Sequence, residues 1–502
     1  MAGRTRSSNS QCPRGSRDCL CRAFTGLRTS FPRGPREGRA APARRLFCLP
    51  GRRRAKRCAA ADSWGSRYAW GASVATAACL AWRHRGPHTG ELMDEPGPLW
   101  RNRDFVLLWS GQVVSTVGMR VTALAYPLLV LALTGSPFQA GLVGFAQSLP
   151  FLVLYLPAGA LIDRWDRRRV MLAADGLRAV LLGLVVLGLA VDVFSVPALL
   201  VIVFLDGACF VFFQLAESAA LPHIVPTSQL PTALAQNQAR ELGADLAGGP
   251  LGGALYAAGR TLPFVFDMLS YAIGFVTLLF VRPGLQDARP RERPRSLRAE
   301  IAEGLVWLWR QPLLRATVVL IGAANLVLTA LPLVLIVRAQ ELGVSPSLIG
   351  AMLAMPGAAG IAGAVAAPWL ERRLSPRAVM IGATWLWVAC TATLVWLPWP
   401  LALGAVVAAC ALPEPVFNVI AMSYRYALTP DRLQGRVLGA ARLVTWGSLP
   451  VGSLAAGSLL QALGARGALA VYAVFTIALA SVATSVPVLR RAPRIQDVKR
   501  PE

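Results

Sequence analysis

From residue 100 onward, the sequence alternates long apolar runs with short polar connections. Each run is long enough to cross the roughly 30 Å hydrocarbon core of a bilayer as one helix. A segment in lipid must satisfy its own backbone hydrogen bonds, and a helix does so within one run. We therefore predict an all-α membrane protein with twelve transmembrane helices. The predicted spans are 105–131, 138–162, 170–191, 197–219, 232–258, 262–281, 313–337, 347–370, 377–397, 399–422, 434–460 and 466–488.

Basic residues are concentrated in alternate connections between these runs. One set, which includes the C-terminal tail, holds 23 arginines and lysines, whereas the opposite set holds only Arg260, Arg338 and Arg466. Positively charged connections stay on the cytoplasmic side of a membrane. We therefore expect a multi-pass protein of the cell membrane, in contact with the lipid bilayer and with both termini in the cytoplasm.

Residues 1–92 differ in composition from the rest of the chain. They hold 19 basic and four acidic residues, so they carry +15 of the net charge of +25. They are rich in Arg, Pro, Gly and Ser and lack helical or strand periodicity. We expect either a non-native extension, with translation starting at Met93, or a disordered basic arm lying on anionic lipid. Positive-inside connections account for the remaining charge, which argues against a nucleic-acid partner.

The longest polar connection divides six spans from six. We expect a six-helix bundle over 93–281, a cytoplasmic connection over 282–312 with an amphipathic helix, a second bundle over 313–490 and a tail over 491–502. The halves repeat each other, since Asp163 and Glu371 end corresponding runs, as do Pro226 and Pro430. Parallel repeats of this kind place the substrate near the midplane between the bundles.

A charged motif separates the second and third runs. It reads Gly159-x-x-x-Asp163-Arg164, followed by Asp166 and the three arginines Arg167, Arg168 and Arg169. This motif resembles the loop between helices 2 and 3 of the major facilitator superfamily (MFS), in which a glycine usually stands at the position of Asp166. We expect the carboxylate and the arginines to latch a cytoplasmic gate in one conformation. The alternative is a solvated positive-inside loop with no mechanical role.

Two further stretches resemble one branch of that superfamily. They are Arg101-Asn-Arg-Asp-Phe105 with Trp109-Ser-Gly-Gln112, and Ala219-Ala-Leu-Pro222 with Val225-Pro226. Both are similar to the branch of macrolide-efflux proteins and the enterobactin exporter. The resemblance implies export of a small amphipathic molecule, such as a drug, a macrolide-like compound or a siderophore, by alternating access. The alternatives are a facilitated or importing nutrient carrier and a non-transporting receptor or scaffold.

The fifth run carries a glycine and proline motif. Gly249, Pro250, Gly252 and Gly253 resemble the fifth-helix motif of drug/proton antiporters, with one residue fewer between the proline and the glycine pair. Proline permits a bend, and glycines four residues apart let two helices approach closely. The resemblance implies the proton as coupling ion. The alternative is that these residues serve only helix packing. The fourth-helix arginine of those antiporters is missing from 197–219, so coupling through that residue has no support.

Ionisable residues inside the runs are candidates for function, because a charge at the bilayer centre costs about 2.5–3.5 kcal/mol. In the first half, Arg120 is expected to line the substrate cavity, or else to pair with Asp206 or Asp267. Asp206 is the candidate for a protonatable carboxylate, and its alternative role is that of a buried partner for Arg120.

Other polar residues have expected partners or positions. Asp175 and Arg178 are three residues apart on one helix face, which predicts a supporting ion pair. Glu217 lies near the cytoplasmic end of its run and is expected to pair with Arg240 or another loop arginine. In the second half, the polar candidates for substrate binding or coupling are Asn325, Glu414, Asn418 and Arg442.

Several chemistries are excluded or unsupported. The two lysines, Lys56 and Lys499, stand outside any Walker A context, so the chain cannot use such a loop to hydrolyse ATP. No nucleophile and base pair stands out, and three scattered histidines do not form a metal centre. We expect a monomeric transporter of a small molecule that is not an enzyme and has no cofactor or metal.

Overall fold

The computed structural model describes residues 98–493, except 283, 286–296 and 431–432. Within these ranges every regular element is a helix. The expectations for 1–92 and for most of the tail therefore fall outside the described residues.

The helices of the first half follow one another with short connections. They are η1 (Leu99–Arg101), α2 (Arg103–Thr134), α3 (Pro137–Val153), α4 (Tyr155–Ile162), α5 (Arg167–Ala190), α6 (Val196–Ile224), α7 (Leu230–Ala258) and α8 (Leu262–Leu279). Polar side chains fix several starts: Asn102, Ser136, Asp166 and Ser195 each accept a hydrogen bond from a backbone N–H in the first turn.

The second half begins with the helix of the central connection. Its helices are α9 (Leu297–Arg310), α10 (Pro312–Glu341), α11 (Pro346–Arg373), α12 (Pro376–Trp396), α13 (Pro400–Ala411), α14 (Glu414–Leu428), α15 (Gln434–Trp446), α16 (Ser448–Ser485) and α17 (Pro487–Arg490). α9 packs on α15, where Gly304 touches the backbone of Arg436.

The described helices account for twelve crossings. Nine helices are long and apolar enough to span a membrane, with α13 and α14 counted as one and α15 and α16 as one, and the pair α3 and α4, bent by 51°, makes a tenth. The bend is explained by Pro157, whose ring would clash in a continuous helix with the carbonyl of Val153, the last residue of α3. α7 is more polar because it contains Arg240, Glu241 and Asp245, and α16 holds two crossings joined at Gly464, where φ is 68°. The twelve predicted helices agree with this arrangement.

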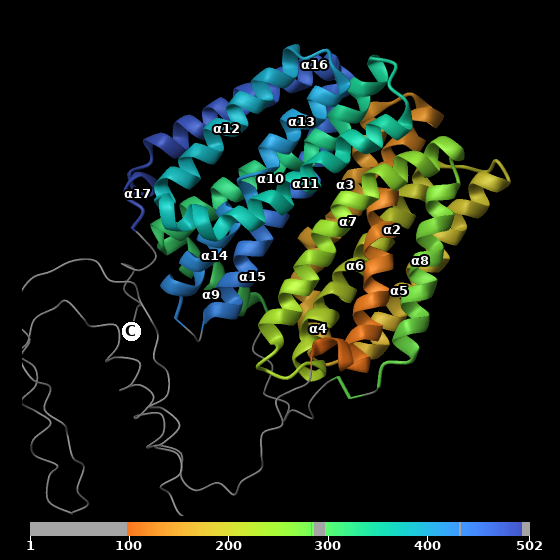
Figure 1. The fold of residues 1–502 in the computed structure, drawn as a ribbon, viewed down its shortest axis with the longest axis horizontal. Coiled ribbons are helices and arrows are strands. Elements are labelled where there is room, and N and C mark those ends of the chain that lie inside the picture. Colours follow the sequence, from red (N-terminus) through yellow and green to blue (C-terminus); the bar gives the residue numbers. More distant parts are fainter. Residues whose placement is uncertain (1–97, 283, 286–296, 431–432, 494–502) are drawn as a thin grey trace, which may run out of the picture. The chain divides into compact units, whose positions relative to one another are not determined.

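The helices form two bundles, one from each half of the chain (Figure 1). The bundles meet mainly through α7 against α11 and α3 against α16. Glycines allow these contacts: a Cβ on Gly350 would lie 2.2 Å from the carbonyl oxygen of Gly249, and one on Gly141 would lie 2.6 Å from the Cα of Gly457. All four glycines lie in the helix halves far from the Asp163 loop, so this end of the protein is closed.

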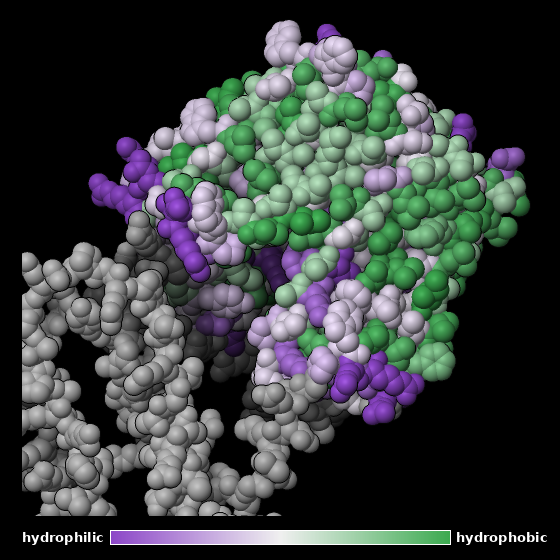
Figure 2. Space-filling model, viewed as in Figure 1, coloured by the Kyte–Doolittle hydropathy of each residue, from purple (hydrophilic) through white to green (hydrophobic). Residues whose placement is uncertain are grey.

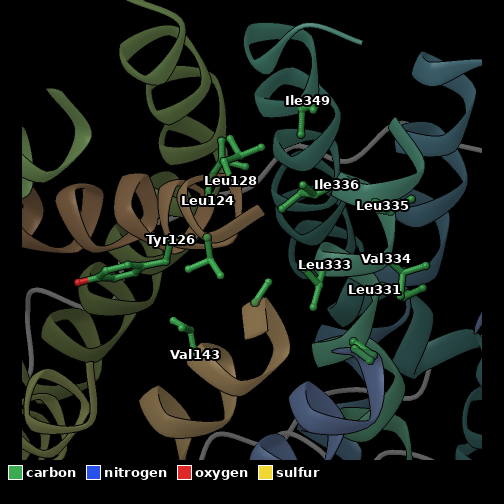
Figure 3. Close-up of a cluster of buried hydrophobic side chains, with 14 of the residues drawn as sticks. Leu124, Tyr126, Leu128, Val143, Leu331, Leu333, Val334, Leu335, Ile336 and Ile349 are labelled. Atoms are coloured by element: carbon green, nitrogen blue, oxygen red, sulfur yellow. The ribbon is translucent and has the colours of Figure 1, made fainter. Parts of the chain in front are cut away.

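A buried apolar cluster reinforces the closed end. Figure 3 shows this cluster, in which Leu124 and Leu128 of α2 face Ile336 of α10 and Ile349 of α11. The outer surface is also apolar, as the broad green areas of Figure 2 show. Exposed leucines, valines and tryptophans on a chain of membrane-spanning helices are the side chains that contact lipid.

Candidate functional site

A polar cavity lies between the two bundles. It consists of three adjoining recesses of about 290, 480 and 680 Å³, and Gln238 of α7 lines all three. Hydrophilic side chains are visible in the hollow between the two halves (Figure 2). Ser218, Leu234 and Gln238 are exposed lining residues near the Asp163 end of α6 and α7, so the cavity is open toward that end.

Arg120 lies in the cavity wall of the first bundle, as expected, but its partners differ from the expected ones. Its Nε lies 2.7 Å from Asp245 Oδ1 and its Nη2 lies 3.3 Å from Glu241 Oε2. The predicted alternative, a pair with Asp206 or Asp267, is wrong. The reason is close helix packing, because a Cβ on Gly248 of α7 would lie only 2.3 Å from the Cβ of Arg120.

The expected pair between Glu217 and Arg240 is present. Arg240 Nη1 lies 2.7 Å from Glu217 Oε1, and Arg240 Nη2 lies 3.4 Å from Glu241 Oε1. Glu217, Arg240 and Glu241 line the same recess. Together with Arg120 and Asp245, these residues form an alternating row of charges along α7 and its neighbours.

Arg178 has a different partner from the one predicted. Its Nε donates to Asp206 Oδ1 at 2.8 Å, and its guanidinium lies over the ring of Tyr271, 4.0 Å from the centroid. Asp175 forms no salt bridge with a described residue, and its buried Oδ2 has no hydrogen-bond partner. The spacing of three residues predicted that Asp175 lies near Arg178 on one helix face. It contains no information on Asp206, the competing carboxylate on α6.

Asp267 is a second buried carboxylate without a cation among the described residues. It accepts hydrogen bonds from Thr122 Oγ1 at 2.7 Å and from Ser270 Oγ at 3.0 Å. A Cβ on Gly118 would lie 2.4 Å from Asp267 Oδ1, so α2 passes directly against this group. The sequence indicated Asp267 only as a possible partner of Arg120.

The second bundle contributes the other wall of the cavity. Three of the four candidates from the sequence, Asn325, Glu414 and Asn418, line it, and the Asn325 side-chain amide donates to the carbonyl of Thr445 at 2.9 Å. Arg425 and Arg442 line the same recess as three aromatic residues, Trp387, Phe417 and Trp446. The sequence counted Arg425 among the connection arginines, because the predicted span ended at 422 whereas α14 continues to Leu428.

The Asp163 loop is anchored within the first bundle. Arg167 is buried and donates to the carbonyls of Ala219 at 2.8 Å and Leu285 at 3.0 Å, and Arg168 donates to the carbonyl of Leu279 at 2.8 Å. Asp166 caps α5 and lies 3.7 Å from Arg169. Asp163 and Arg164 are exposed. Two of the arginines therefore serve to hold the ends of α6 and α8.

The glycine motif of α7 forms packing contacts. α7 is continuous through Pro250, with Gly249 and Gly253 against α11 and Gly252 against α2. A Cβ on Gly253 would lie 2.5 Å from the carbonyl oxygen of Pro346. These residues thus join the two bundles at the closed end of the cavity.

Comparison with known proteins identifies the family. The family described as "Transmembrane secretion effector" matches residues 97–498, nearly all of the described chain. The chain belongs to this family of the major facilitator superfamily. It is an MFS efflux transporter, a multi-pass protein of the cell membrane, and thus falls outside the enzyme classes.

Curated relatives are efflux pumps. The "Multidrug efflux pump Tap" of Mycobacterium tuberculosis is 29% identical over 420 residues, which cover 80% of this chain and 98% of that protein. The "Macrolide efflux protein A" of Streptococcus pyogenes is 26% identical over 209 residues, which cover 41% of this chain and 51% of that protein. These relatives agree with the branch that the sequence motifs resemble.

Solved structures share the fold. A bacterial homologue of the human lysosomal transporter Spinster, in an inward-facing and occupied conformation, matches with a TM-score of 0.63 and 13% identity. That match covers 81% of this chain and 100% of the homologue. The nucleoside transporter NupG matches with a TM-score of 0.61 and 12% identity over 78% of this chain and 100% of NupG.

Proposed function

We propose that this MFS transporter exports a small amphipathic molecule by alternating access, with the proton gradient as its energy source and one chain as the working unit. The observation that carries the proposal is the polar cavity between the bundles, which is lined from both sides and sealed at one end by the contacts of Gly249 and Gly350. A cavity of this kind binds a molecule from one side of the membrane and releases it on the other when the bundles rock.

The cavity opens on the side from which an exporter collects its substrate. The cavity is open toward the Asp163 loop, and the connections at that end carry most of the arginines. By the positive-inside rule this end faces the cytoplasm. In our proposal the structure is the state that collects substrate from the cytoplasm, and the glycine contacts separate when substrate leaves.

A buried group of charges beside the cavity supports proton coupling. Arg178 forms an ion pair with Asp206 of α6. Asp175, one turn before Arg178 on α5, has a buried carboxylate oxygen without a hydrogen-bond partner. The Arg178 guanidinium thus pairs with Asp206, and Asp175 lies outside ion-pair distance of it. We propose that a proton arriving at Asp206 releases Arg178 toward Asp175, so that protonation changes the packing of α5 against α6.

The Asp163 loop is proposed to act as the cytoplasmic latch. Arg167 and Arg168 fix the loop to the ends of α6 and α8, so it moves with the first bundle as a rigid part. Asp163 and Arg164 are exposed at the open end of the cavity. When the bundles close on this side, these charged groups are in position to meet the second bundle.

Reconstitution tests this proposal. The purified chain in proteoliposomes should move ethidium or erythromycin against the concentration gradient of that compound when an inward proton gradient is imposed. Collapse of the proton gradient should stop the movement. Asp206→Asn should stop uphill movement, whereas the exposed Asp192→Asn should behave as the unmodified protein. Movement that ignores the proton gradient would contradict proton coupling.

A further inference from the structure

The cavity wall of the second bundle holds two arginines without an acidic partner. Arg425 of α14 and Arg442 of α15 both line the recess of about 480 Å³. Neither has a carboxylate within ion-pair distance among the described residues. This wall therefore presents positive charge to the cavity.

The contacts of these arginines hold them in place without neutralising them. Arg442 donates to the Tyr155 hydroxyl, and its guanidinium lies 5.8 Å from the ring of Tyr155 and 5.4 Å from that of Trp446. Arg425 contacts the sulfur of Met422 at 4.0 Å, and its buried Nε lacks a hydrogen-bond partner. A half-buried, unpaired cation in a membrane protein raises the free energy, because its charge is partly removed from water. Binding of an anion lowers that free energy.

The first bundle shows the opposite arrangement. Arg120 and Arg240 are each paired with two carboxylates, of which only Glu241 is shared by both arginines. Glu414 lines the recess of the arginines but forms no ion pair with a described residue, and it shares a second recess with Asp245 of α7. The cavity thus has a net acidic charge along α7, whereas α14 and α15 contribute two unpaired guanidiniums and the single carboxylate of Glu414.

We propose that Arg425 and Arg442 receive an anionic group of the transported molecule, such as a carboxylate, phosphate or sulfonate. Guanidiniums suit such groups because they donate paired hydrogen bonds to two oxygens. Trp387, Phe417 and Trp446 line the same recess and take the apolar body of the molecule. The inference rests on the proposed function, since it names the substrate class of that cavity.

Binding to the full chain in lipid nanodiscs tests this inference. Fluorescein, an aromatic anion, and ethidium, an aromatic cation, are titrated against the protein and followed by fluorescence anisotropy. Arg425→Gln and Arg442→Gln should each weaken fluorescein binding by about tenfold. The same variants should bind ethidium more tightly, because a repelling charge is removed. Arg442→Lys keeps the charge but loses the paired hydrogen bonds, so its fluorescein affinity should lie between those of the unmodified protein and Arg442→Gln. The exposed Arg260→Gln should change the binding of neither probe.

The signs of these changes separate a binding role from a structural one. A variant that only damages the fold weakens the binding of both probes, and this result would overturn the inference. The inference would also be overturned if fluorescein did not bind, or if its binding did not depend on either arginine. Binding is measured without transport, so the proposed function is tested separately. Fluorescein binding with no uphill movement of any probe would contradict the proposed function, whereas uphill movement of ethidium without fluorescein binding would contradict only the anion site.

Discussion

Arg178 of α5 and Asp206 of α6 form a buried ion pair beside the central cavity, with Nε 2.8 Å from Oδ1. The guanidinium also lies against the rings of Tyr271 and Phe210, so it is held between two helices and two aromatic side chains. Arg178 lines one recess of the cavity, whereas Asp206 lies behind it. The pair therefore connects the substrate pathway with the interior of the first bundle.

Asp206→Asn should destabilise the protein, because it leaves the buried charge of Arg178 without its partner. Removing one member of a buried pair lowers the free energy of unfolding by about 3–5 kcal/mol. Thermal unfolding of the purified protein measures the effect, with the exposed Asp192→Asn as control. A double variant, Asp206→Leu with Arg178→Met, should recover much of the loss. Equal melting temperatures for Asp206→Asn and the unmodified protein would contradict the observed pairing.

Asp175→Asn separates coupling from transport. The side chain keeps its size but can no longer form an ion pair with Arg178. The rate of uphill export should therefore fall at least about tenfold. Exchange of labelled for unlabelled substrate across proteoliposomes should continue, since the cavity itself is unchanged. If uphill export by Asp175→Asn equals that of the unmodified protein, Asp175 has no part in coupling.

Gly350→Val should prevent closure of the end far from the Asp163 loop. A Cβ at Gly350 would lie 2.2 Å from the carbonyl oxygen of Gly249, which cannot move without shifting α7. Export should drop by at least about tenfold because the bundles can no longer reach the described state. Gly382→Val is the matched control, since no atom lies within 4 Å of a Cβ there. Export at normal rates by Gly350→Val would show that this contact is dispensable.

Arg167→Ala should lower the free energy of unfolding, whereas Arg169→Ala should leave it nearly unchanged. Arg167 is buried and donates to two backbone carbonyls, whereas the Arg169 side chain is 86% exposed. Hydrogen bonds from a charged group contribute about 1.5–3 kcal/mol each, so the free energy of unfolding should fall by about 3 kcal/mol or more. Thermal melts of the two variants give the comparison, and indistinguishable melts would argue against the anchoring role of Arg167.

The helices were predictable from the sequence because a membrane span needs a long apolar run. Their ends were less predictable where polar residues continue a helix. α6 extends to Ile224 and α14 to Leu428, beyond the predicted 219 and 422, because the polar residues there face other helices or the cavity rather than lipid. The position of Arg425 in the cavity wall was missed for this reason.

The charged pairs were harder to predict than the helices. Sequence spacing relates residues on one helix, such as Asp175 and Arg178, whereas Asp206 approaches from another helix. Similarly, Arg120 meets Asp245 because Gly248 lets α7 approach α2 closely. Such pairings depend on tertiary packing, which spacing along a single helix does not contain.

The most direct test of the proposed function is energised efflux from cells that lack their own pumps. Cells that make this chain are loaded with ethidium or erythromycin, and loss of the compound is followed with and without a protonophore, against an empty-vector control. The account predicts faster loss of a compound with the chain than without it, and no difference once the protonophore is added. Equal loss with and without the chain, despite its insertion in the membrane, would contradict export, and faster loss that survives the protonophore would contradict the proton as energy source.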